Sequence, residues 1–155
     1  MRVGIGYDVH PLVAGRPLVL GGVEVPFERG LSGHSDADVV VHAIIDALLG
    51  AAALGDIGTH FPSSDPQYEG MSSIALLGRV GDILRGAGIE VVNIDATIVA
   101  ERPRLVPYVD EMRYAICEAL DIANEQVSVK ATTTDGLGFA GHGEGIAAHA
   151  VALVE

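Results

Sequence analysis

The run from His34 to Gly58 constrains this chain more than any other stretch of its sequence. It begins with small and polar residues, continues as a long apolar segment, and ends in a glycine-containing turn. If the segment is helical from about Ala37, then Asp38, His42 and Asp46 are four residues apart and share one narrow stripe. The positions around them are apolar on nearly every face, which predicts a buried helix. A histidine between two acids in such a helix indicates a specific chemical role.

The first segment of the chain supplies two further groups of the same kind. Residues 2–10 alternate strictly, as a strand does, and Pro11 is expected to end that strand. Asp8 and His10 would then occupy the last two outward positions of one face. Together with His42 they provide one carboxylate and two imidazoles, a familiar ligand set for catalytic zinc with the fourth position open. The alternative is a pair of exposed polar residues at a strand end.

The two acids that flank His42 have competing interpretations. Asp46 is the preferred partner for the second ring nitrogen of His42, since metal-binding histidines commonly donate that N–H to an oxygen acceptor. In the alternative, Asp38 only caps the helix and Asp46 only faces solvent. Ser35 is the predicted N-cap, with Asp38 at the position of the capping-box acid.

The remaining elements follow from alternation, helical spacing and turn residues. The predicted order is strand, hairpin, two helices, strand, helix, two strands. Their expected ranges are 17–26 for the hairpin, 28–33 for a loop, 60–70 for an exposed loop, 72–85 for the second helix, 92–98 for a strand, 107–120 for the third helix, and 127–131 and 145–154 for the last strands. This order predicts an α/β fold, an α+β sandwich in which helices cover one face of a mixed four-stranded sheet beside a small hairpin.

The last predicted strand is apolar on both faces apart from His149, so the second sheet face is expected to pack on another subunit. A length of 155 residues indicates a single domain, residues 1–155. The formal charge of −12 argues against non-specific binding of nucleic acid. The one cysteine, Cys117, lies in a helical pattern and is expected to be a buried structural thiol. With no leader and no apolar run of membrane length, these features predict a soluble cytoplasmic protein.

The stretch TTTDGLGF, residues 132–139, follows a predicted strand and is rich in hydroxyl groups and small residues. Its backbone N–H groups and threonine side chains are suited to phosphate oxygens, and Asp135 is suited to a hard cation such as Mg²⁺. The alternative is an ordinary turn in which threonine finishes a strand.

Four blocks, GYDVH, GHSDADVVVHAIIDALLGAAALGDIGTHFP, VKATTTDGLGF and GHGEGIA, occur in this order and are spread from the first predicted strand to the last. Together they resemble the 2-C-methyl-D-erythritol 2,4-cyclodiphosphate synthase family. The resemblance implies cyclisation of 4-diphosphocytidyl-2-C-methyl-D-erythritol 2-phosphate with release of CMP, in the non-mevalonate isoprenoid precursor pathway. It also implies a homotrimer with active sites between subunits.

The resemblance assigns roles to individual residues. Asp8, His10 and His42 would hold a divalent metal, usually Zn²⁺, and Asp135 would hold Mg²⁺ or Mn²⁺ with the substrate diphosphate. His34 and Thr133 stand at the family's catalytic positions. The implied substrate-binding residues are Ser35, Asp56, Gly58, Phe61, Pro62, Ser63, Ser64, Asp65, Ala100, Pro103, Arg104, Leu105, Val106, Thr132, Thr134, Phe139 and His142.

Two positions depart from the commonest family pattern. Asp135 replaces a usual glutamate, and its metal site is expected to survive through a water or a small loop shift. His142 replaces a usual arginine, which the resemblance places at a cavity along the trimer axis where some members hold an isoprenoid diphosphate. Because histidine is only partly charged near neutral pH, anion binding there is expected to be weak or pH-dependent.

Two other classes of function compete with the cyclase. A metal-dependent phosphohydrolase would use the same Asp8, His10 and His42 site to activate water and would form no cyclic product. A non-catalytic cytidine-nucleotide-binding protein would keep the pocket of residues 100–106 and tolerate the loss of His42.

Overall fold

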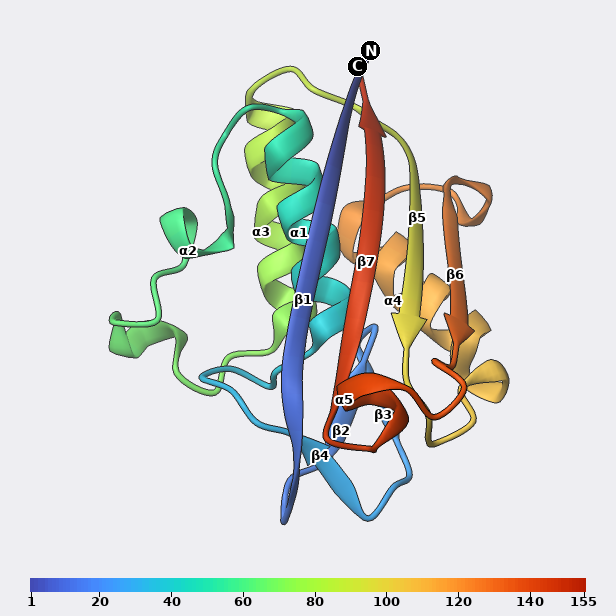
Figure 1. Cartoon of the computed structure of the whole chain (residues 1–155). Coiled ribbons are helices and arrows are strands. Elements are labelled where there is room, and N and C mark those ends of the chain that lie inside the picture. The colour runs from blue at the N-terminus through green and yellow to red at the C-terminus, as the bar shows by residue number, and fades with distance from the viewer.

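The computed structural model describes residues 1–155 as a five-stranded sheet, a separate two-stranded hairpin and three longer helices on one side of the sheet (Figure 1). The strands are β1 (Arg2–Ala14), β2 (Leu18–Leu20), β3 (Val23–Val25), β4 (Arg29–Leu31), β5 (Val91–Val99), β6 (Val127–Thr132) and β7 (Gly145–Val154). The helices are α1 (Val39–Ala51), α2 (Ile57–His60), α3 (Ser73–Gly86), α4 (Val109–Leu120) and α5 (Gly138–Gly141), with 3₁₀ turns at Pro66–Tyr68, Val106–Tyr108 and Asn124–Gln126.

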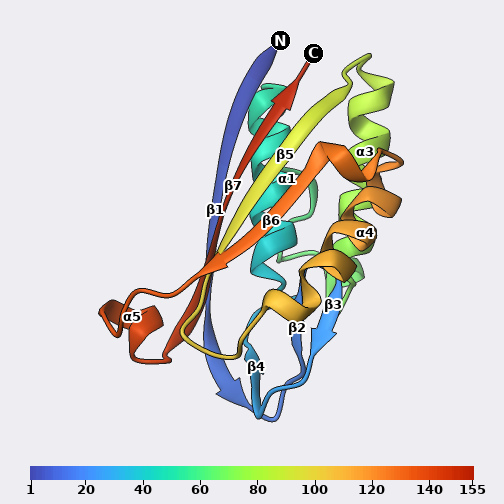
Figure 2. The same ribbon diagram turned by 90° about the vertical axis from the view of Figure 1, so that its right-hand side faces the viewer.

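The sheet is mixed, as predicted, with the strand order β4-β1-β7-β5-β6. β1 and β5 run antiparallel to β7 between them, and β5 pairs in parallel with β6. Figure 2 shows α1, α3 and α4 together on one side of this sheet. The predicted fold class is therefore confirmed, and a short fifth strand, β4, is added where the sequence indicated only a loop.

The expectation that Pro11 ends the first strand is wrong. β1 pairs with β7 as far as the Pro11–Gly145 pair, and from Leu12 to Ala14 it pairs with β4 instead. Proline lacks a backbone N–H, so it weakens a strand only where that donor is needed. The carbonyl of Pro11 still accepts a hydrogen bond from the Ser32 N–H at 3.0 Å. The strand therefore continues past the proline by changing partner.

The two faces of β1 are also reversed relative to the expectation. Gly4 and Gly6 lie against α1, because a Cβ atom at either position would overlap a carbonyl oxygen of that helix. Asp8 and His10 share this face and so point inward rather than outward. The apolar residues of the opposite face are exposed, and Ile5 has an exposed fraction of 72%.

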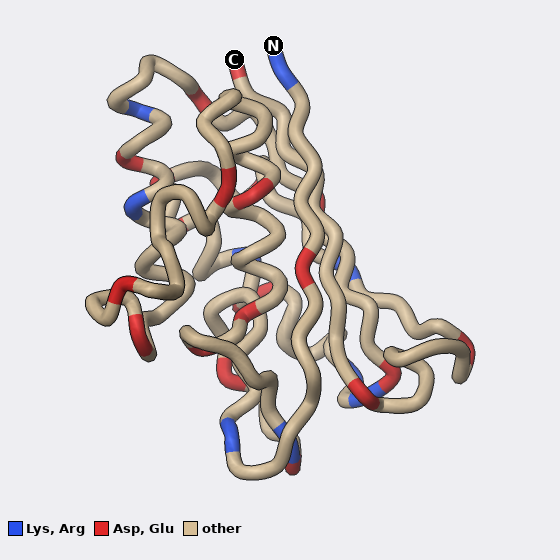
Figure 3. The backbone as a smooth tube through the Cα atoms, turned by 60° about the vertical axis from the view of Figure 1, so that its left-hand side comes forward, with Lys and Arg blue, Asp and Glu red and all other residues tan.

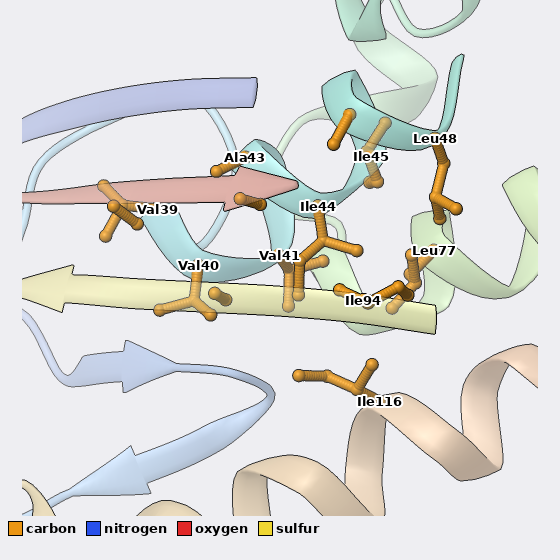
Figure 4. Close-up of a cluster of buried hydrophobic side chains, with 14 of the residues drawn as sticks. Val39, Val40, Val41, Ala43, Ile44, Ile45, Leu48, Leu77, Ile94 and Ile116 are labelled. Carbon is orange, nitrogen blue, oxygen red and sulfur yellow. The ribbon is translucent and has the colours of Figure 1, made fainter. Parts of the chain in front are cut away.

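The helix that includes His42 is buried, as predicted. Ten of the thirteen residues of α1 are buried, and the polar His42 lies on the side near β1. Figure 4 shows valine and isoleucine side chains of α1 against Ile94 of β5, Leu77 of α3 and Ile116 of α4. Burial of each such side chain stabilises the folded state by about 1.5–3 kcal/mol. Because α1 contributes ten buried residues, it forms the centre of the core.

The start of α1 differs from the prediction in its capping residue. Asp38, rather than Ser35, is the N-cap, and its carboxylate accepts the Val41 N–H at 3.1 Å. The same carboxylate accepts the N–H groups of Gly21 and Gly22, at 2.9 and 2.7 Å, in the turn of the predicted hairpin. Burial raises the pKa of Asp38 to about 6 although these three donors favour its charged form. Asp38 thus joins the hairpin to the helix.

Apart from Asp38, the acidic and basic residues lie outside this core. Figure 3 shows acidic positions spread along the chain, with only a few basic positions between them. Cys117 is buried in α4, as predicted, and burial raises the pKa of its thiol. None of the helices combines the length and the apolar character needed to cross a membrane.

Candidate active site

Asp8 and His10 from β1 meet His42 from α1 in one partly buried group, which we call the Asp8 centre. Oδ2 of Asp8 lies 3.1 Å from Nε2 of His10 and 3.0 Å from Nδ1 of His42. One ligand atom from each of the three residues lies within 4.8 Å of the others. The predicted convergence of the three side chains is therefore confirmed, and the group can hold a metal ion.

The electrostatics of the Asp8 centre favour a cation. Burial opposes the charge on Asp8, but hydrogen bonds with His10 and His42 outweigh it and lower its pKa to about 2. The hydrogen bond with Asp8 is the main cause that raises the pKa of His10. A carboxylate thus stays ionised between two imidazoles, and one oxygen with two nitrogen donors fits the ligand set of catalytic zinc.

The second ring nitrogens of the two histidines have separate partners. Nδ1 of His10 lies 2.8 Å from the Ser32 carbonyl oxygen. Nε2 of His42 lies 2.8 Å from Oγ of Ser73 and 3.2 Å from Oγ of Ser35. The predicted pairing of His42 with Asp46 is wrong, because the Asp46 carboxylate accepts the Ile57 N–H at 2.8 Å instead.

A cavity of about 180 Å³, the His34 cavity, adjoins the Asp8 centre. Besides His10 and His42, five predicted site residues line it, namely His34, Ser35, Gly58, Phe61 and Ser63. Ile57 also lines the cavity, beside the predicted Gly58. Tyr68 and Leu76 complete the lining and were not predicted, because neither residue carries a chemical signal in its local sequence.

Four predicted residues lie outside this lining. Asp56 caps α2 by accepting the Thr59 N–H at 2.8 Å, and Asp65 accepts the Gln67 N–H at 3.1 Å. Hydrogen bonds with Thr59 and Gln67 lower the pKa of these two carboxyl groups, respectively. Pro62 and Ser64 stand on the same loop.

A second and larger hollow, the β5–β6 cavity, has a volume of about 640 Å³. It lies where the parallel strands β5 and β6 end at one edge, a usual place for ligands in α/β proteins. Seven predicted residues line it: Ala100, Pro103, Arg104, Leu105, Val106, Thr132 and Thr133. The lining also includes Phe27, Glu28, Glu101, Arg102 and Ala131. Phe27 and Glu28 come from a distant loop and were not predicted.

The residues after β6 form an exposed turn. Asp135 has a positive φ of 54°, and the Thr133 hydroxyl lies 3.5 Å from its carboxylate. The Thr134 N–H lies 3.4 Å from the Glu101 carboxylate. Asp135 does not join the Asp8 centre, whose metal-ligand group consists of Asp8, His10 and His42.

The last two predicted residues lie on and beside α5. Phe139 is 40% exposed. His142 lines a small cavity together with Arg29 and Arg102. Neither residue lines the His34 cavity or the β5–β6 cavity.

The two main cavities belong to different parts of the molecule. Their linings share no residue, and β7 and β5 stand between β1, which carries the Asp8 centre, and the edge strand β6. Figure 1 shows α2 beyond the β1 edge of the sheet, whereas β5 and β6 lie toward its opposite edge. One copy of the chain therefore keeps the metal-ligand group apart from the larger cavity.

Fold and site together define an α/β protein with an Asp-His-His metal-ligand group and a separate ligand-sized cavity. The model of the YgbB family matches residues 1–155, and the chain belongs to that family.

Named relatives match over almost the whole chain. The chain is 66% identical over 154 residues to a 2-C-methyl-D-erythritol 2,4-cyclodiphosphate synthase of Pelotomaculum thermopropionicum, covering 99% of this chain and 95% of that protein. It is 64% identical over 155 residues to the protein of the same name from Syntrophomonas wolfei, covering 100% and 99% of the two chains.

Solved structures match the fold over almost the whole chain as well. A 2C-methyl-D-erythritol-2,4-cyclodiphosphate synthase in a CDP-bound form has a TM-score of 0.90 at 32% identity, with 99% of this chain and 100% of that chain covered. The bifunctional IspDF from Campylobacter jejuni has a TM-score of 0.95 at 40% identity over 99% of this chain. This chain spans only 42% of that longer protein.

Proposed function

We propose that this chain is a 2-C-methyl-D-erythritol 2,4-cyclodiphosphate synthase that works as a single domain, residues 1–155. It cyclises 4-diphosphocytidyl-2-C-methyl-D-erythritol 2-phosphate and releases CMP, a step in isoprenoid precursor synthesis. The observation that carries the proposal is the Asp8 centre, in a chain 66% identical to a protein of that name. An oxygen of the 2-phosphate attacks the β-phosphorus, and the bond from that phosphorus to the oxygen bridging to the α-phosphate breaks.

The Asp8 centre would hold Zn²⁺ or another divalent ion in this reaction. When bound, the ion supplies Lewis-acid chemistry by drawing charge from the β-phosphate. Asp8 contributes a carboxylate that is ionised at neutral pH, since its pKa is lowered to about 2. His10 and His42 would contribute ring nitrogens from two different elements, so the position of the ligand group depends on how α1 packs against β1.

Positioning and charge stabilisation supply most of the rate in phosphoryl transfer. His34 is exposed on the lining of the His34 cavity and would donate a hydrogen bond to phosphate oxygens there. The Thr133 hydroxyl would do the same from the rim of the β5–β6 cavity. Asp135, two residues further on, would hold Mg²⁺ or Mn²⁺ with the diphosphate.

The substrate would extend between the two cavities. Its methylerythritol end would lie with Ser35, Asp56, Gly58 and the loop 61–65. Its cytidine end would occupy the β5–β6 cavity, whose volume of about 640 Å³ suits a nucleotide. The residues proposed for that end are Ala100, Pro103, Arg104, Leu105, Val106, Thr132 and Thr134.

A homotrimer would bring the two cavities together. They share no lining residue within one chain, so the Asp8 centre of one subunit needs a β5–β6 cavity from another. The open apolar face of β1 supplies a surface for such an assembly, since Val3 and Ile5 are 68% and 72% exposed. The expected cytoplasmic location stays a prediction.

The test is product analysis with purified protein, the diphosphocytidyl substrate and Zn²⁺ plus Mg²⁺. Wild type is expected to release CMP and cyclic diphosphate in equal amounts. His42→Ala should lower the rate at least about 100-fold, because one metal ligand is lost from a charge-stabilising site. The matched control is His60→Ala, since His60 lines neither cavity and should stay within threefold of wild type.

The same assay separates the competing functions. Release of CMP without cyclic diphosphate would identify a phosphohydrolase. Binding of cytidine nucleotide without any CMP release would identify a binding protein. Activity of His42→Ala close to that of wild type would contradict the metal mechanism.

A further inference from the structure

A buried serine connects the metal ligand His42 to a carboxylate that the reaction does not use. Ser73 is the first residue of α3 and has an exposed fraction of 0%. Its Oγ lies 2.8 Å from Nε2 of His42 and also donates a short hydrogen bond to Oδ1 of Asp36. The Ser73 N–H donates to the other oxygen of Asp36 at 3.0 Å. Three residues from two distant segments thus form one chain of hydrogen bonds.

The chemistry of the groups sets the direction of these hydrogen bonds. An ionised carboxylate only accepts, so the hydroxyl proton of Ser73 is directed to Asp36. The oxygen of Ser73 is then free to accept the Nε2–H of His42. Nδ1, which lies 3.0 Å from the Asp8 carboxylate, is then the ring nitrogen that would give up its proton and offer its lone pair when a metal ion binds.

His10 is set in the opposite sense by a different acceptor. The carbonyl oxygen of Ser32 only accepts, so Nδ1 of His10, at 2.8 Å, carries the proton there. Its Nε2 therefore faces Asp8, at 3.1 Å. The two histidines present different nitrogens to the same carboxylate, and each needs its own partner to select the right one.

Besides Asp8 and Ser73, few groups around His42 can hold its ring. Its neighbours along α1 are apolar and buried, and the Asp46 carboxylate is engaged by Ile57. Ser35 is a weaker partner at 3.2 Å, and its hydroxyl also accepts the Ala37 N–H at 3.3 Å. Ser73 makes the shorter contact with Nε2.

We propose that Ser73 and Asp36 are positioning residues, which hold the His42 ring and its Nε2–H form so that Nδ1 is presented for metal binding. This inference rests on the proposed metal role of the Asp8 centre but not on the identity of the substrate. The segment that leads into Ser73 also contacts the loop that carries His34. Three residues before Ser73, the Gly70 N–H donates a hydrogen bond to the His34 carbonyl oxygen at 3.2 Å.

The first test measures the affinity of the full-length protein for Zn²⁺ by competition with a chromogenic chelator. Ser73→Ala is expected to weaken Zn²⁺ binding about 10–100-fold, the usual effect of losing a partner that orients a metal-bound histidine. The matched control is Ser72→Ala, because Ser72 is the exposed neighbour and its side chain makes no cap hydrogen bond. Equal affinities in wild type and Ser73→Ala, or an equal loss in Ser72→Ala, would overturn the proposal.

The second test starts from the wild type, so its first result does not depend on whether a variant folds. In the Zn²⁺-loaded wild type, long-range ¹H–¹⁵N spectra of the imidazoles should show His42 bound through Nδ1, with a protected Nε2–H. Ser73→Ala should lose that protection while Ser72→Ala keeps it. Binding of His42 through Nε2 in wild type would refute the proposal. Because neither readout involves turnover, a protein that binds Zn²⁺ in this way but forms no cyclic product would refute the proposed function alone.

Discussion

Gly6 of β1 packs so closely on α1 that the Cβ atom of any other residue there would overlap the carbonyl oxygen of Ala43. Gly6→Ala is therefore expected to push the helix from the sheet and lower the free energy of unfolding by about 2–3 kcal/mol. The same shift should weaken Zn²⁺ binding, since Asp8 is two residues further along the strand. Denaturant unfolding and chelator competition measure the two effects.

Gly50→Ala provides the control within the same packed pair. Gly50 is exposed in α1, and a Cβ atom there would meet nothing within 4 Å. Alanine is the better helix former by about 1 kcal/mol, so this variant should be as stable as wild type or slightly more stable. Gly6→Ala with unchanged stability would contradict the close packing of α1 on β1.

At the scale of single residues, the group that could hold a metal was predictable from the sequence, but the partners of its histidines were not. Asp8 and His10 alternate with apolar residues, and His42 interrupts an apolar helix, so each carries a signal in its own segment. Ser73 carries none, because it is 31 residues from His42 and its local pattern indicates only the start of a helix. Asp46 has the right spacing on α1 but is engaged by Ile57.

Among the elements, the junction of α1 with the hairpin β2–β3 depends on one carboxylate. Asp38→Ala would leave three N–H donors without their acceptor, those of Gly21, Gly22 and Val41. We expect a loss of about 3 kcal/mol in the free energy of unfolding near pH 5. The control is Asp82→Ala, whose exposed ion pair with Arg85 should contribute less than about 1 kcal/mol.

The difference in the free energy of unfolding between wild type and Asp38→Ala should depend on pH with a definite sign. Burial raises the pKa of Asp38 to about 6, above the value of about 3.9 in an unfolded chain. The stability linked to this group is thus fully present below about pH 4 and is lost as the pH rises through 6. The gap between wild type and Asp38→Ala should narrow from pH 5 to pH 8. A widening gap would mean that the three donors outweigh burial.

Most elements were predictable because their periodicity reflects burial on one face. The exceptions have physical reasons. Pro11 suggested a strand end, yet β1 continues because it changes partner there from β7 to β4. β4 and α5 have only three and four residues, too few for a period to be recognised.

At the scale of the whole molecule, the exposed apolar face of β1 allows the assembly of subunits to be tested. Wild type is expected to sediment as a trimer at micromolar concentration. Ile5→Glu places a charge on a residue that is 72% exposed in one chain and would be buried between subunits, so it should give monomers. CMP release should fall with it, since each active site would need two subunits.

Ala75→Glu is the matched control, because Ala75 is exposed on α3, on the helical side of the molecule. It should remain trimeric and active. A wild type that sediments as a monomer would exclude the shared site. The apolar pattern of the last strand predicted a subunit contact. The faces of β1 were assigned the wrong way round, because glycine does not reveal what packs on it.

The pairing of β1 with β7 places the two ends of the chain side by side. Arg2 pairs with Val154, and Figure 1 shows both termini at the same end of the sheet. Arg2 lies six residue steps along β1 from Asp8, a distance of about 20 Å. A second domain could thus be fused at either terminus without approaching the metal ligands. A short linker could equally close the chain into a ring, and new termini could then be opened in a distant loop.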